Sequence, residues 1–340
     1  MIDRETVQLP VRFAVLRASV PTLKAWMADQ PAPSEVLGGP VTLVVWGRQD
    51  TTVDGRVIGA LCGMVLNHDE VRGKIAQRGL DPRLDSHPRL AVQHVGAFGV
   101  AGLADLRWHG SLALLHRGTG TALVARDLLG VGWLGWRSLG ADEVVFSNDA
   151  RLTGMQAVPP GLAVQLDMGG VRGVRVSYAP QNQAFLREIP DELRRADPQT
   201  VAAGLRDRMR AAVLACIDAH NAIARPPGNL PQFVRDQLDL CGEGPTQWTA
   251  AGLGEPPVAR AEELPSRDGP WPDPGPAEPV DRIGPDELRR RLWRHRALPD
   301  GQLRQEQAEA MTAGRCLVAP HLDPAVVAWM GAAAQVGPPR

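Results

Sequence analysis

The sequence is poor in the residues that build disulfide frameworks, zinc sites and membrane spans. Its 340 residues include four cysteines, which are widely separated and form no CxxC pair: Cys62, Cys216, Cys241 and Cys316. This spacing predicts a reduced, cytoplasmic chain. No apolar run reaches membrane length and the first residues, MIDRETVQ, are polar, so neither a membrane span nor a signal peptide is expected.

An excess of charge of one sign is also missing. The formal net charge is −1 at pH 7, which predicts no nucleic-acid partner and no attraction to an anionic membrane. Hydrophobic residues make up 44% of the chain, enough for a globular core, and the length predicts two domains.

The central stretch, Thr121–Trp136 (TALVARDLLGVGWLGW), predicts two strands and a turn. Thr121–Ala125 is apolar and β-prone, and Arg126 and Asp127 interrupt it. Three glycines then allow the chain to turn before Trp133 and Trp136 resume a strand: Gly130, Gly132 and Gly135. We expect the two strands to form a hairpin.

Short strand-like runs surround this stretch. They are residues 11–18, 41–47, 56–66, 110–116, 143–147 and 162–166. One helix is expected to begin after Ser19 as N-cap, with Pro21 in its first turn, and to end before Pro31. Another is expected over residues 69–79, with Gly79 as the C′ residue that ends it. Periodicity alone therefore predicts an α+β fold.

The order of several phrases resembles the glutaminase domain of the asparagine synthetase family. Ala125-Arg126-Asp127 with Leu129-Gly130 resembles its ARDxxG phrase, residues 146–149 (FSND) resemble "FASE", and residues 158–161 (VPPG) contain its PPG turn. Upstream, residues 62–67 (CGMVLN) and the helix after them resemble the "NGEIYN" strand and its helix. The positions that match most directly are Gly63, Asn67, Arg126, Asp127, Gly130, Pro160 and Gly161.

That resemblance implies a particular architecture for residues 1–190, the αββα sandwich of N-terminal nucleophile hydrolases. Residues 191–340 then form a smaller, mostly helical remnant of the ATP-dependent α/β synthetase domain. Residues 298–300 (LPD) and 320–324 (PHLDP, with Asp323) are similar to its "LPD" and "PFLD" phrases. Helices are expected at 199–223, 285–296 and 302–313 and after an Asp323-Pro324 cap. Residues 242–285, rich in Pro and Gly, read as a linker or irregular loop.

The chemistry of both halves is missing from the sequence. Residue 2 is Ile2, so removal of Met1 exposes no Cys, Ser or Thr whose α-amine could serve as base. The family's "HRGPD" phrase has no counterpart, its "NG" becomes Cys62-Gly63, and its "SDTE" is reduced to residues 85–88 (DSHP). No SGGxDS pyrophosphate loop occurs, and residues 303–307 hold no lysine, which makes Arg304 and Glu306 a solvated helix face. We therefore expect no catalytic, cofactor-binding or metal-binding residues.

Other patterns favour structural roles over chemistry. Residues 130–135 (GVGWLG) match GxGxxG, with Asp149 at the offset of a ribose ligand, but a strand rather than a helix follows, which favours a hairpin. Arg126 and Asp127 are expected to be a buried, structural ion pair. The arginines at 289–296 read as a solvated helix, and five scattered histidines lack metal-ligand spacing: His68, His87, His94, His109 and His116.

Two functions from different classes remain open. The first is a catalytically degenerate asparagine-synthetase-like scaffold, accessory or regulatory subunit. Its expected partners are a second copy of itself, a synthetase or a peptide-modifying enzyme. The alternative is a divergent ATP-dependent amide- or peptide-bond-forming synthetase, of asparagine synthetase or macrolactam-cyclase type. Only that alternative requires ATP and Mg²⁺, and it needs a partner to bind them. A small-molecule binder using the old glutamine cleft is a third possibility.

Overall fold

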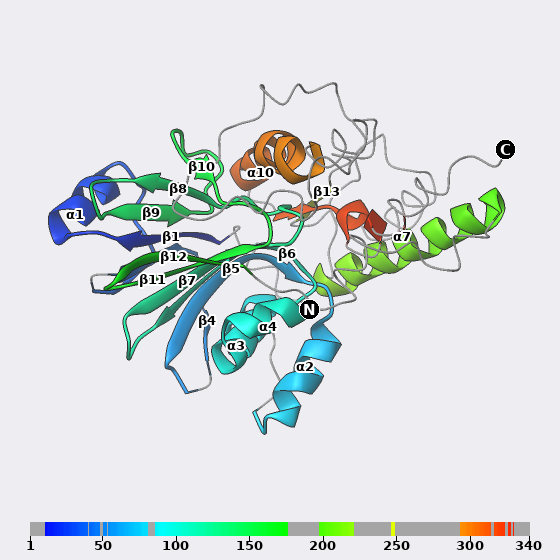
Figure 1. Cartoon of the computed structure of the whole chain (residues 1–340), viewed down its shortest axis with the longest axis horizontal. Coiled ribbons are helices and arrows are strands. Elements are labelled where there is room, and N and C mark those ends of the chain that lie inside the picture. Colours follow the sequence, from blue (N-terminus) through cyan, green and yellow to red (C-terminus); the bar gives the residue numbers. More distant parts are fainter. Residues whose placement is uncertain are drawn as a thin grey trace, which may run out of the picture.

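The computed structural model describes residues 11–39, 41–47, 50–52, 54–80, 86–175, 197–220, 246–248, 293–313, 316–323, 326–327 and 329. Two stacked antiparallel sheets make up most of it (Figure 1). The first sheet runs, in spatial order, β10 (Gln156–Ala157), β8 (Gly135–Ser138), β9 (Val144–Ser147), β1 (Arg12–Arg17), β3 (Val41–Trp46) and β2 (Glu35–Gly38).

The second sheet also has six strands. Their order is β12 (Gly170–Arg175), β11 (Leu162–Asp167), β7 (Thr121–Arg126), β6 (Trp108–His116), β5 (Val57–Val65) and β4 (Asp50–Thr51). The expected strands at 11–18, 41–47, 56–66, 110–116, 143–147 and 162–166 all occur, within a residue or two of their bounds.

Apolar side chains fill three layers between and outside the sheets. Alternate residues of β1, such as Phe13 and Val15, pack between the sheets against Ile58 and Val124. The other face of β1, with Ala14 and Leu16, packs against helices on the outside of the first sheet. This double burial explains why the central strands read as continuous apolar runs instead of alternating ones.

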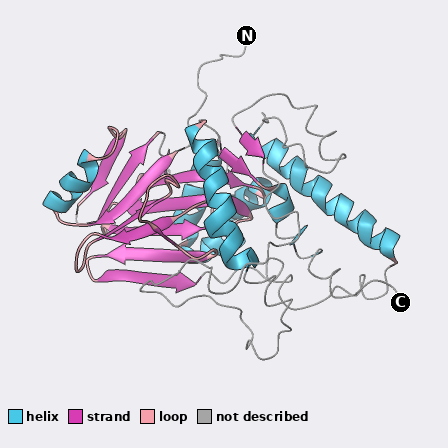
Figure 2. Ribbon diagram, turned by 90° about the horizontal axis from the view of Figure 1, so that it is seen from above, coloured by secondary structure: helices cyan, strands magenta, loops and turns pink. Residues whose placement is uncertain are grey.

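Helices cover both outer faces (Figure 1), and Figure 2, seen from above, shows one helix lying across the front of the strands. The second sheet is covered by α2 (His68–Gln77), α3 (His87–Phe98) and α4 (Val100–Asp105). The first is covered by α1 (Val20–Ala28) and, from the far end of the chain, by α10 (Leu303–Thr312). The described chain is therefore an α+β sandwich with the layer order α, β, β, α.

Local signals placed the first helices correctly. The Ser19 hydroxyl accepts from the Thr22 amide at the start of α1, with Pro21 in its first turn. Gly79 follows α2 with φ of 71°, in the left-handed region. The expectation for residues 85–88 was incomplete, because Ser86 is the N-cap of α3 and accepts from the Arg89 amide at 3.2 Å. Neither α3 nor α4 was predicted.

The expected hairpin at Thr121–Trp136 is wrong. β7 pairs with β6 and β11 in the second sheet, whereas β8 pairs with β9 and β10 in the first. Residues 127–134 cross from one sheet to the other. Crossing is possible because Gly132 lies directly on Gly110 of β6, where a Cβ on Gly132 would stand 2.2–2.6 Å from the Gly110 backbone.

The far end of the chain contributes α7 (Pro198–His220), β13 (Thr246–Trp248), a π-helix η4 (Trp293–Gln302), α10, β14 (Cys316–Val318) and η5 (Pro320–Leu322). β13 pairs with β14 in parallel. Helices were expected at 199–223 and 302–313, and α7 and α10 occupy those ranges. The linker at 242–285 lies outside the described residues except for β13, and so does most of the helix at 285–296.

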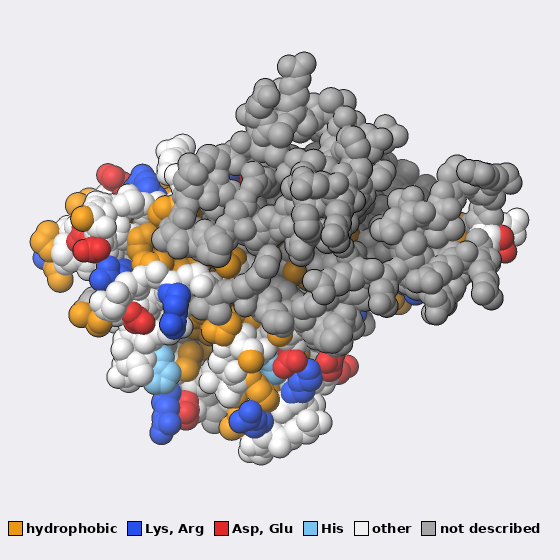
Figure 3. Space-filling model, in the orientation of Figure 1, with side chains coloured by type: hydrophobic (Ala, Val, Ile, Leu, Met, Phe, Trp, Pro, Cys, Tyr) orange, Lys and Arg blue, Asp and Glu red, His pale blue; other side chains and the backbone are white. Residues whose placement is uncertain are grey.

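These later elements pack on the sandwich. Leu298, Leu303 and Leu322 share a buried cluster with Val131 of the crossing segment. The division into domains at residue 190 stays a prediction. On the face shown in Figure 3, charged side chains of both signs are interspersed, in keeping with the net charge of −1. Among the described helices, none has the length and apolarity needed to cross a bilayer.

The contact between Gly132 and Gly110 generates a stability prediction. In Gly132→Ala the added methyl group has no space and meets backbone atoms, so we expect a loss of at least about 1–3 kcal/mol in the free energy of unfolding, measured by chemical denaturation. The control is Gly73→Ala, exposed on α2 with nothing near its Cβ position, which should gain ~0.5–1 kcal/mol. Equal effects in the two variants would contradict the close approach.

Candidate functional site

The residues singled out by the sequence gather where the crossing segment meets the far end of the chain. Arg126 ends β7, Asp127 and Gly130 begin the crossing, and the turn with Pro160 and Gly161 precedes β11. Gly130 has φ of 69°, and a Cβ there would stand 2.7 Å from Pro299 and 2.8 Å from Pro160. Three segments distant in sequence therefore touch at this glycine.

Asp127 holds the crossing segment together through its carboxylate. Oδ1 accepts from the amides of Leu129 and Val131, both at 3.1 Å, and Oδ2 accepts from the amides of Gly132 at 2.8 Å and Gly110 at 3.1 Å. The Gly161 amide donates to the Asp127 carbonyl at 2.9 Å. One side chain thus satisfies four backbone donors that a sheet crossing would otherwise bury without partners.

The Asp127 side chain is fully buried. Burial raises the pKa of its carboxyl above the ordinary value, while the amides of Gly132, Gly110 and Val131 and the charge of Arg126 pull the pKa down. Because these amide donors are held in place by the fold, the carboxylate binds the backbone of the crossing segment and is not exposed to solvent.

Arg126, also fully buried, has its ion-pair partner far away in sequence. Its Nη1 donates to Asp300 Oδ1 at 2.8 Å and to the Val158 carbonyl at 2.7 Å. Its Nη2 donates to the Pro299 carbonyl at 2.9 Å and the Gly130 carbonyl at 3.1 Å, and Nε donates to the Gly132 carbonyl at 2.7 Å. The expected burial of both residues is observed. The expected pairing of Arg126 with Asp127 is corrected: their principal partners are Asp300 and the backbone amides.

We call the contact of Arg126 with Asp300 and the Pro299 carbonyl the joint between the sandwich and the far end of the chain. Trp133 extends this joint to α10. Two guanidinium groups lie over its ring, that of Arg126 at 5.4 Å and that of Arg304 at 4.2 Å from the ring centroid. Its amide donates to the side chain of Gln307, and Arg304 donates to the carbonyls of Ala150 and Leu152 at 3.3 and 3.0 Å. The expectation that Arg304 lies on a solvated helix face is wrong, because α10 presents it to the sandwich. Glu306, half-buried, accepts from Gln302 at 3.3 Å.

A second contact between the sandwich and the far end of the chain involves two more of the positions that match the family's phrases, Asn67 and Asp323. Asp323 is buried and forms an ion pair with Arg107 at 3.1 Å. The Arg107 amide donates to Asn67 Oδ1 at 2.9 Å, and Asn67 Nδ2 donates to the Asp105 carbonyl at 2.9 Å. Asn67 therefore fixes the start of α2 to the end of α4, and the arginine that follows α4 holds the far end of the chain.

The region matching the family's "NG" phrase is closed. Cys62 and Ser111 are register partners on β5 and β6, and both are buried, with 5% and 0% of their surfaces exposed. Gly63 faces Gly110, and a Cβ on Gly63 would stand 2.0 Å from the His109 carbonyl oxygen. The glycine is thus required for the close approach of two strands.

The start of β1 is held by the FSND segment. Asn148 accepts from the Phe13 amide at 2.7 Å and donates to the Val11 carbonyl at 2.9 Å. Asp149 pairs with Arg12 at 2.9 Å and with Arg151 at 2.7 Å. Burial opposes ionisation of Asp149, but hydrogen bonds from Arg151 and Arg12 outweigh it and hold the pKa of the carboxyl below its usual range. The Asp149 carboxylate is therefore occupied by the side chains of Arg12 and Arg151.

The sequence points to several residues of this site, but it does not show which residues they contact. The phrase at 298–300 was singled out, but nothing in it indicates that Asp300 pairs with an arginine at position 126, and Gln307 carried no signal at all. Within the described part of the chain no group of three His, Cys, Asp or Glu side chains is placed to hold a metal ion.

Comparison with known proteins gives structural likenesses only. No protein-family model matches the chain. No curated protein matches it either. The solved structures it resembles include the glutamine phosphoribosylpyrophosphate amidotransferase of B. subtilis complexed with ADP and GMP, with a TM-score of 0.35 and 11% identity. The likeness covers 75% of this chain and 64% of that one.

Two further structures show the same level of likeness. One is an allosteric regulatory enzyme of purine biosynthesis, with a TM-score of 0.35, 13% identity and coverage of 75% and 63% of the two chains. The other is a glutamine aminotransferase class-II domain protein from Silicibacter pomeroyi, with a TM-score of 0.32, 12% identity and coverage of 49% and 91%. The chain spans less than two thirds of the length of the first two proteins.

The network around Asp127 predicts a large effect of its removal. Asp127→Ala leaves four buried amides without their acceptor and removes a negative charge beside Arg126, so we expect a loss of roughly 3–5 kcal/mol, out of the ~5–15 kcal/mol typical of a domain. Chemical denaturation of the purified variant measures it. The control is Asp142→Ala, an exposed acid, which should change stability by less than about 0.5 kcal/mol. If Asp127→Ala unfolds like the parent, the network is not structural.

Proposed function

We propose that this chain is a catalytically degenerate relative of the asparagine-synthetase-type amidotransferases that acts as a scaffold, accessory or regulatory subunit. Its partner is a second copy of itself or an amide-forming synthetase. The family assignment rests on the phrases at 125–130, 146–149 and 158–161, and the lack of activity rests on what surrounds them.

One observation carries the proposal. The charged residues that match the family or lie in its phrases are buried and engaged with the protein itself: Arg126 with Asp300, Asp127 with backbone amides, and Asp323 with Arg107. A group that binds substrate must be able to exchange its partner for the substrate. Arg126 and Asp323 instead hold the far end of the chain on the sandwich, and Asp127 holds the crossing segment, which is a structural use of the same residues.

The start of β1 supports the same conclusion. An N-terminal nucleophile hydrolase places a Cys, Ser or Thr at the free start of this strand, where its α-amine acts as base. Here the strand and the residue before it read VRFAVLR, with no such side chain, and Asn148 binds the backbone of Val11 and Phe13. The position of the family's asparagine, whose amide donates to the developing oxyanion, holds buried Cys62.

The alternative is an ATP-dependent amide-forming synthetase in which a partner supplies nucleotide binding. The lack of a SGGxDS loop in the sequence argues against ATP binding by the chain alone. The engagement of Arg304 with Trp133 and two carbonyls argues against a catalytic role for α10. Association with a synthetase is common to both readings, so enzyme activity discriminates between them better than binding does.

The test is made on the purified full chain. We expect no glutamate from glutamine and no heat on titration with Mg·ATP, because the nucleophile and the pyrophosphate loop are missing. We expect a mass above one chain in size-exclusion chromatography with light scattering, either alone or with a synthetase encoded beside it. Glutamate formation that is lost in Cys62→Ala, with melting unchanged, would overturn the degenerate reading. Micromolar binding of Mg·ATP would favour the alternative. A chain that remains monomeric both alone and in the presence of the synthetase would refute the proposed scaffold role.

A further inference from the structure

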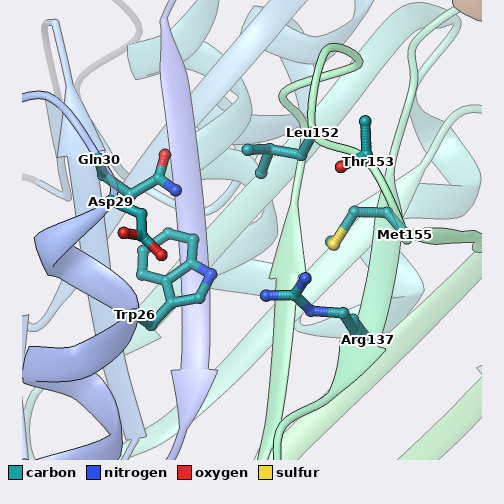
Figure 4. A pocket seen from close by; sticks show the side chains of 7 residues that line it. All are labelled: Trp26, Asp29, Gln30, Arg137, Leu152, Thr153 and Met155. Atoms are coloured by element: carbon teal, nitrogen blue, oxygen red, sulfur yellow. The ribbon is translucent and has the colours of Figure 1, made fainter.

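A small pocket opens on the outer face of the first sheet, the face that α1 and α10 cover (Figure 4). Its volume is about 160 Å³. The end of α1 supplies one side, and β8 with the loop before β10 supplies the other. The lining residues are Trp26, Asp29, Gln30, Arg137, Leu152, Thr153 and Met155.

The two sides carry opposite charges over an apolar base. In Figure 4 Trp26, Asp29 and Gln30 stand on one side and Arg137 extends toward them from the other, below Met155. Trp26 and Met155 are 6% and 7% exposed, whereas Asp29 and Arg137 are exposed. Among the hydrogen bonds and salt bridges of the described residues, none joins Asp29 to Arg137. Each charge is therefore available to a molecule that lies between them.

We propose that this pocket binds a free α-amino acid with a small branched apolar side chain. The carboxylate of such a molecule accepts a bidentate pair of hydrogen bonds from the Arg137 guanidinium. Its ammonium group donates to the Asp29 carboxylate. Asp29 is also the C-cap residue of α1, so the negative end of the helix dipole reinforces attraction for a cation there.

The remaining lining selects the side chain. The Trp26 indole, Leu152 and Met155 form an apolar surface between the two charged groups, where a branched aliphatic group packs without unpaired polar atoms. A cavity of ~150 Å³ holds one benzene molecule, so this pocket, of about 160 Å³, has room for the side chain of an amino acid of the size of valine or leucine. The site goes beyond the proposed function, because it uses none of Arg126, Asp127 and Asp323; its one link to them is the Leu152 carbonyl, which accepts from Arg304.

The experiment titrates the purified full chain with L-leucine, followed by isothermal calorimetry and by the fluorescence of Trp26 and the other tryptophans. Two analogues test the charges separately: isocaproate lacks the ammonium group and isoamylamine lacks the carboxylate. We expect L-leucine to bind and each analogue to bind at least about tenfold more weakly, because each loses one charge-assisted contact.

Variants assign the binding to this pocket. Arg137→Gln and Asp29→Asn should each weaken leucine binding by at least about tenfold without changing the melting temperature, because both side chains are exposed. Arg117→Gln, an exposed arginine on the turn before β7, is the matched control and should bind like the parent. Absence of binding at millimolar leucine, equal binding of isocaproate, or unchanged binding in both pocket variants would each overturn the proposal.

Discussion

The fold depends on the way one crossing between two sheets is satisfied. Residues 127–134 leave the second sheet and enter the first, so their backbone groups lack ladder partners while lying in the core. Asp127 supplies an acceptor for four amides, and Arg126 supplies donors to the carbonyls of Gly130 and Gly132. Two adjacent charged side chains therefore do for an irregular segment what strand pairing does elsewhere. Gly132 completes the arrangement, because only a residue without a side chain lies this close to Gly110.

The same residues explain why the far end of the chain belongs to the sandwich. After Arg126 has bonded to the crossing segment, one guanidinium edge still faces outward. Asp300 and the Pro299 carbonyl complete it. A buried arginine without that carboxylate leaves an uncompensated charge, which costs roughly 3–5 kcal/mol, whereas a buried pair by itself adds little stability over apolar packing. The Arg126–Asp300 pair instead specifies where the far end of the chain packs, because η4 and α10 satisfy Arg126 in one placement. The contacts of Trp133 with Arg304 and Gln307 require the same placement.

The sequence was informative wherever structure is decided locally. The hydroxyl of Ser19, the proline after it and Gly79 mark helix ends through contacts within a few residues, and the apolar strands are visible because both faces are buried. The turn at Gly130–Gly135 misled, because its composition suits a hairpin and a sheet crossing equally, and only the position of Gly110 decides between them. The partners of Arg126 and the packed side of α10 depend on contacts between residues more than a hundred positions apart, so no local pattern reveals them. Likewise the residues facing across the pocket come from α1 and the segment at 137–155, which periodicity does not bring together.

The most direct test of the buried joint is a double-mutant cycle between Arg126 and Asp300, measured as free energies of unfolding by chemical denaturation of the parent, Arg126→Met, Asp300→Ala and the double variant. The structure predicts that each single change costs roughly 3–5 kcal/mol and that the double variant is hardly less stable than the worse single one, so the coupling is close to the smaller single cost, at least about 3 kcal/mol. Costs that add to within ~0.5 kcal/mol would show that the two residues do not act together, and would contradict a joint built on their ion pair.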